Sequence, residues 1–72
     1  MTRNELDTAL ISAFVRNDGA EIARIYGSAG DMSDEIDEAC FLWVQAYVFA
    51  LEAGSSDAEV YRSKLRKHGR EA

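Results

Sequence analysis

The chain has 72 residues, a single cysteine at Cys40 and a formal net charge of −5. This length allows one domain, which we expect to cover residues 1–72, and a lone cysteine excludes a disulfide within the chain. The acidic balance disfavours nucleic-acid binding, because that activity needs a basic surface that neutralises phosphates.

Two amphipathic helices are predicted first along the chain. The earlier covers about residues 5–16, with Asn4 as its expected N-cap. Apolar side chains recur at helical spacing on one face of it: Leu6, Ala9, Leu10, Ala13 and Phe14. The next covers about residues 19–29, and Gly30 is expected just beyond its end, where glycine commonly terminates a helix.

A third helix is predicted over about residues 34–53, with Ser33 as its N-cap and several acidic residues in its first turns. Residues 40–51 read CFLWVQAYVFAL, in which Gln45 is the only polar side chain. The aromatic and β-branched residues also favour a strand. The uninterrupted length and the acidic start favour the helix.

This third helix carries apolar residues on nearly every side, so neighbours must cover most of it. One stripe is expected to face the other helices: Ile36, Ala39, Cys40, Trp43, Val44, Tyr47, Val48 and Leu51. A second stripe lies on another side: Leu42, Ala46, Phe49, Ala50 and Ala53. In a chain this short, we expect the second stripe to remain open to a partner.

The fourth predicted helix covers about residues 57–68, and Ser56 with Glu59 matches a capping box. Lys64, Arg66 and Lys67 lie near its C-terminus, where cations suit the helix dipole. The basic residues of this segment are expected to be solvated, or to pair with the acidic body. Together the four segments predict an all-α fold, a small antiparallel bundle of three to four helices.

Part of the chain is also similar to a known repeat. Residues 22–26 read IARIY, which places a small residue and an aromatic on one helix, and residues 29–31 stand where a loop would follow. Ala39 and Trp43 then fall on the next helix. In these positions residues 20–65 resemble a Sel1-like repeat, a relative of the tetratricopeptide repeat. The resemblance implies paired antiparallel helices, and a plain helical bundle is the alternative.

No motif for catalysis, a cofactor or a metal is recognisable. The acidic residues between Asp31 and Glu38 do not follow the EF-hand spacing, and they suit the start of a helix. His68 is the only histidine and has no partner at a recognised spacing, and the glycines do not form a phosphate loop. We therefore expect no enzymatic activity and no cofactor.

The sequence also bears on location. The N-terminus starts polar and acidic, unlike a secretory signal. The apolar run over residues 39–51 is shorter than the roughly 20 residues that span a bilayer. We expect a cytoplasmic protein without a membrane segment.

The function expected from these patterns is a small non-catalytic protein–protein interaction module, an adaptor or a self-associating helical domain. Five residues of the third helix form the expected interface with a protein partner or a second copy: Leu42, Trp43, Ala46, Phe49 and Ala53. The alternative is an acidic inhibitor or decoy that covers the basic nucleic-acid-binding groove of a target enzyme. Residues 1–59 support it, because they hold twelve acidic residues and three arginines.

Overall fold

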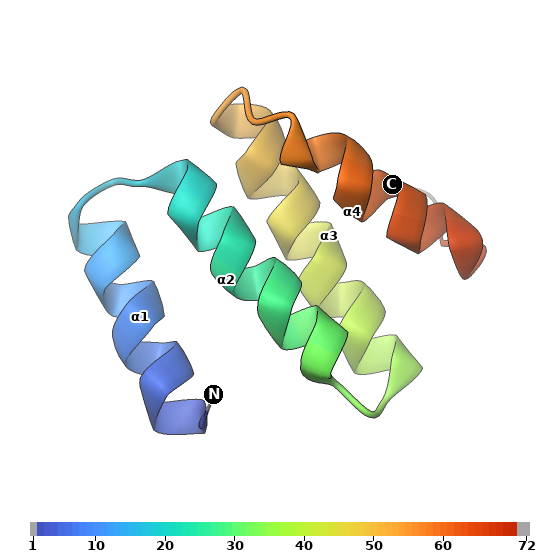
Figure 1. Cartoon of the computed structure of the whole chain (residues 1–72), viewed down its shortest axis with the longest axis horizontal. Helices are drawn as coiled ribbons and strands as arrows, with labels where there is room; N and C mark the ends of the chain where they lie inside the picture. Colours follow the sequence, from blue (N-terminus) through green and yellow to red (C-terminus); the bar gives the residue numbers. More distant parts are fainter. Residues whose placement is uncertain (1, 71–72) are drawn as a thin grey trace.

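The computed structural model describes residues 2–70, which form four α-helices joined by short connections (Figure 1). The helices are α1 (Arg3–Val15), α2 (Gly19–Met32), α3 (Ile36–Glu52) and α4 (Asp57–Lys67). Each helix packs mainly on its neighbour in the chain, and α2 and α3 lie antiparallel at the centre. The predicted all-α bundle is confirmed, and residues 40–51 are helical rather than extended.

The molecule is a thin slab, with Cα extents of 33 × 28 × 12 Å. In Figure 1, α1 lies at one edge of the slab and α4 at the other. Because the slab is thin, no helix is enclosed on every side, and each keeps an outer face. Within residues 2–70, no helix has the length and apolar character that crossing a bilayer requires.

Two groups of buried side chains hold the slab together. The central core joins α2, α3 and α4 through Ala23, Ala39, Cys40, Trp43, Ala46, Ala50, Ala58, Tyr61 and Leu65. The smaller α1 core consists of Ala13, Ile22 and Ile25, with Leu6, Ala9 and Leu10 packed beside it. The predicted apolar face of the first helix is therefore confirmed for these α1 residues.

The start of α1 differs from the sequence prediction. Thr2, rather than Asn4, is the N-cap. The Glu5 backbone N–H donates to Thr2 Oγ1 at 3.2 Å, and the Thr2 N–H donates to Glu5 Oε1 at 3.4 Å. This reciprocal capping box satisfies two helix-end donors, whereas Asn4 alone would satisfy one.

Two further caps also differ. Ser33 ends α2 instead of starting α3, although its hydroxyl accepts from the Glu35 N–H at 3.3 Å. Ser56 precedes α4 but makes no capping bond, because the neighbouring Ser55 Oγ accepts from the Asp57 N–H at 3.2 Å. Gly54 follows α3 with a φ of 68°, a conformation that suits glycine, and α3 ends close to the predicted residue 53.

The sequence predicted that Gly30 lies just beyond the end of the second helix, but α2 continues to Met32. A Cβ atom at Gly30 would lie 2.5 Å from Trp43 Nε1, and one at Gly27 would overlap the Tyr61 ring. Both glycines are buried inside α2. They let the rings of Trp43 and Tyr61 pack directly on the α2 backbone, so the close fit of the central core depends on them.

Candidate functional site

The structure separates the five residues expected to form an interface. Trp43 is 8% exposed and Ala46 is 0% exposed, so both belong to the central core. Their assignment to a surface is wrong: Gly30 of α2 lets that helix approach closely and cover Trp43, and Ala46 lies in the same core. Leu42 and Phe49 are half-buried, and only Ala53 is exposed.

Phe49 connects the two cores. Its ring stacks on Tyr26 with centroids 5.8 Å apart, and it meets Phe14 edge-to-face at 5.6 Å. It therefore holds α1 against the central pair of helices, and its half-buried ring is largely covered by side chains of the same chain.

The apolar residues that α3 does expose lie on a different side. Phe41 is 61% exposed, Leu51 is 54% exposed and Val48 is 43% exposed, with Val44 half-buried between them. Their spacing of i, i+3, i+7 and i+10 places them on one side of the helix. We call these four residues the α3 outer stripe. The sequence prediction had directed Val48 and Leu51 inward, and that orientation is wrong.

Carboxylates lie at both ends of the α3 outer stripe. Asp37 and Glu38 are in the first turn of α3, and Glu52 is its last residue. Asp37 Oδ1 accepts from Arg70 Nη2 at 2.5 Å, and this contact raises the pKa of Arg70. Glu38 and Glu52 make no ion pair among residues 2–70, so their charges are not neutralised by the described part of the chain.

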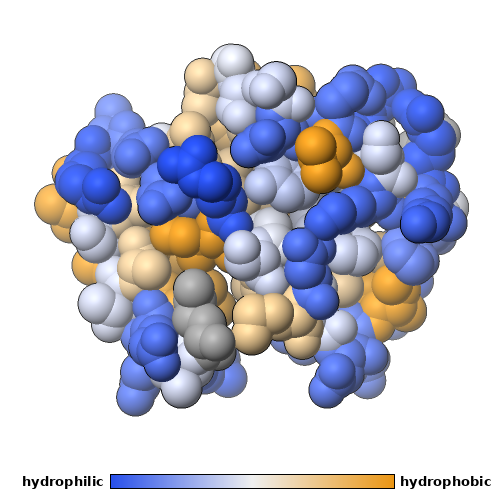
Figure 2. Space-filling view, in the orientation of Figure 1, coloured by the Kyte–Doolittle hydropathy of each residue, from blue (hydrophilic) through white to orange (hydrophobic). Residues whose placement is uncertain are grey.

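A second exposed apolar area lies on α1. Ile11 and Val15 project from the side of that helix opposite the buried Ala13. In Figure 2, hydrophobic colouring reaches the margin of the molecule where α1 lies in Figure 1. Elsewhere on that view the hydrophobic areas are separate spots between hydrophilic residues.

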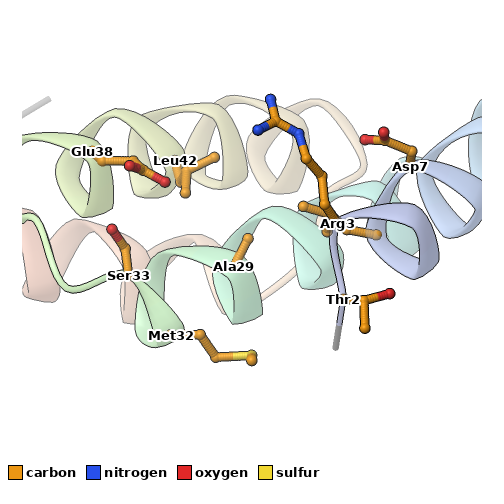
Figure 3. Close-up of a pocket in the computed structure, with 9 residues that line it drawn as sticks. Thr2, Arg3, Asp7, Ala29, Met32, Ser33, Glu38 and Leu42 are labelled. Carbon is orange, nitrogen blue, oxygen red and sulfur yellow. The ribbon is translucent and has the colours of Figure 1, made fainter.

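A shallow groove runs between one end of α1 and α3, with α2 as its floor (Figure 3). Its volume is about 550 Å³, and it is lined by Thr2, Arg3, Leu6, Asp7, Ala29, Met32, Ser33, Glu38 and Leu42. The charged groups in it are two carboxylates and one guanidinium, without a nucleophile paired to a base. Within residues 2–70, no group of three or more His, Cys, Asp or Glu side chains is arranged to hold a metal ion.

Trp43 organises a polar cluster between α2, α3 and α4. Its indole N–H donates to Asp31 Oδ1 at 3.1 Å, and Lys64 Nζ donates to the same oxygen at 2.6 Å. Lys64 Nζ also lies 5.6 Å from the Trp43 ring centroid, and His68 stacks on that ring at 5.7 Å. His68 thus has a structural contact here, as a ring that covers the indole.

The basic end of the chain pairs with the acidic body, as the sequence allowed. Lys64 binds Asp31, and Arg70 binds Asp37. Nearby, burial is the main factor that raises the pKa of Tyr61, and the charges of Asp57 and Asp31 raise it further. These ion pairs are mostly exposed, so each adds little stability. The Lys64–Asp31 pair joins α4 to α2, and the Arg70–Asp37 pair joins the segment after α4 to the first turn of α3.

Asp31→Ala is expected to lower the free energy of unfolding by about 1 kcal/mol, because it removes both the Trp43 acceptor and the Lys64 partner. Asp31→Asn keeps an acceptor oxygen for the indole and should cost less. Trp43 is the only tryptophan, so its fluorescence reports unfolding in urea directly. Equal losses in the two variants would show that the indole hydrogen bond adds nothing.

Comparisons with family models, with curated proteins and with solved structures give no match to this chain.

Proposed function

We propose that the protein is a non-catalytic protein–protein interaction module that binds its partner through the α3 outer stripe. The observation that carries this proposal is the exposure of Phe41, Val48 and Leu51 in line on one helix. Aligned exposed apolar side chains cost free energy in water unless another molecule covers them, and such areas commonly mark interaction sites.

The position of α3 also supports the proposal. It packs on α2 along one side and on α4 along another, so its outer side chains project from the best-held helix of the slab. A rigid surface binds with a smaller loss of conformational entropy than a flexible one. Ile11 and Val15 are a weaker candidate, because α1 buries only Ala13 and contacts α2 alone to any large extent.

The competing binding surface is formed by the acidic residues of positions 1–59, which an inhibitor of a basic groove would use. Much of its charge lies in the first turns of α1, α2, α3 and α4, where carboxylates favour the helix dipole. Asp31 and Asp37 are also occupied by Lys64 and Arg70. These features favour the apolar stripe. A cytoplasmic location and a Sel1-like ancestry fit such a module and are part of the same proposal.

The test compares two double variants of the full chain. Phe41→Ser with Val48→Ser alters the α3 outer stripe, and Ile11→Ser with Val15→Ser is the matched control on α1. We expect the unaltered chain to form a complex or dimer, detected by sedimentation velocity and by capture from the native host. The α3 variant should lose this complex and the α1 variant should keep it. The two variants are matched because all four altered side chains are exposed.

Circular dichroism should show all three proteins to be equally helical, because exposed substitutions leave the cores intact. The proposal fails if the two double variants and the unaltered chain sediment as the same monomer and capture the same proteins.

A further inference from the structure

We infer that the occupant of the α3 outer stripe is an amphipathic helix whose apolar face is flanked by lysine or arginine residues. This inference rests on the proposed function and adds the chemistry of the partner. It is drawn from the shape of the stripe, from the charges around it and from the net charge of the chain.

The shape of the stripe fits a helix. From Phe41 to Leu51 the four side chains follow α3 over about 15 Å, at about 1.5 Å of rise per residue. A partner helix of three or four turns, with apolar residues at i, i+3, i+4 and i+7, would contact all of them. Within residues 2–70, all of the regular secondary structure is helical, so no strand edge is present to pair with an extended peptide.

The charges around the stripe select a basic partner. Glu38 and Glu52 are exposed near its two ends and are in no ion pair among the described residues. On the neighbouring α4, Arg62 is paired with Glu59, and beyond the end of α4 Arg70 is paired with Asp37 of α3. On α3 itself the exposed charges left beside the stripe are therefore those of Glu38 and Glu52, and cations on the rim of a partner helix would lie opposite these carboxylates.

A second copy of the chain would be repelled by these charges rather than attracted. Each copy has a net charge of −5, so two copies repel at long range. If two stripes paired about a two-fold axis, the same patch would face itself, and the unpaired Glu38 and Glu52 would be brought together in the same interface. Like charges brought together at an interface oppose binding, so the structure favours a basic partner over self-association.

The test uses two synthetic peptides with the same leucine stripe, one flanked by lysines and one by glutamates. Binding to the full chain is measured by fluorescence anisotropy at low salt, where the Debye length is about 30 Å at 0.01 M. The lysine peptide should bind at least about tenfold more tightly than the glutamate peptide. Replacing Phe41 and Val48 by serine should weaken lysine-peptide binding by at least about tenfold, while replacing Ile11 and Val15 should not.

A second variant isolates the charge. Glu38→Gln with Glu52→Gln keeps the shape of the surface and should narrow the difference between the two peptides. Equal binding of the two peptides would overturn the inference. So would an affinity for the lysine peptide that neither the charge variant nor the stripe variant changes.

Failure of the inference can be told apart from failure of the proposed function. If neither peptide binds but the chain self-associates through Phe41 and Val48, the occupant is a second copy. The interaction module then stands, and the basic partner is refuted. If the substitutions at Phe41 and Val48 alter neither peptide binding nor assembly, both proposals fall.

Discussion

Leu65→Ala is expected to lower the free energy of unfolding by about 2–5 kcal/mol, the largest effect among the substitutions considered. Leu65 is 0% exposed and is the largest fully buried side chain among residues 2–70. It lies on α4 and belongs to the central core that also contains Trp43 and Cys40. Removing it deletes apolar contacts and leaves a cavity in the central core.

A loss of that size is serious for a small domain, whose total stability is commonly about 5–15 kcal/mol. Urea unfolding followed by circular dichroism measures it. Leu51→Ala is the matched control, because the same side chain is 54% exposed on α3. It should change stability by about 0.5 kcal/mol or less. Comparable losses at the two positions would mean that α4 does not pack on α3 as described.

Gly30→Ala is expected to destabilise the fold by about 1–3 kcal/mol, although alanine is the better helix former by about 1 kcal/mol. The new Cβ would lie 2.5 Å from Trp43 Nε1 and 3.2 Å from the Ala39 carbonyl oxygen. The indole is fixed by Asp31 and by the stacked His68, so it has little room to move away. The clash should therefore outweigh the gain in helix propensity.

Ser28→Ala is the control for helix propensity, because Ser28 is exposed on the same helix. It should be neutral or slightly stabilising. Urea unfolding followed by Trp43 fluorescence compares the two variants. A Gly30→Ala protein more stable than the unaltered chain would show that α2 and α3 are not held as closely as the Trp43 contact requires.

Local patterns in the sequence predicted the four helices well. Helical spacing of apolar residues and the acidic start of the third segment gave the elements to within a few residues of the observed ends. The caps were less accurate, because Thr2 and Asn4, like Ser55 and Ser56, are all common capping residues by type. Which one is used depends on the partner that the backbone brings within reach, as Glu5 shows for Thr2.

The sequence could not give the orientation of α3. That helix is apolar nearly all round, so its own pattern does not distinguish a covered side from an exposed one. Ala46 was assigned to the surface and is buried, whereas Val48 and Leu51 were assigned to the interior and are exposed.

The sequence by itself therefore determined that this is an all-helical chain with a central helix too apolar to stand alone. Only the tertiary structure decided which side of that helix is covered. The reason is found in the neighbouring helix α2, whose Gly27 and Gly30 lack the side chains that would hold Tyr61 and Trp43 away. Close packing is a property of two surfaces together, so the pattern of one segment cannot reveal it.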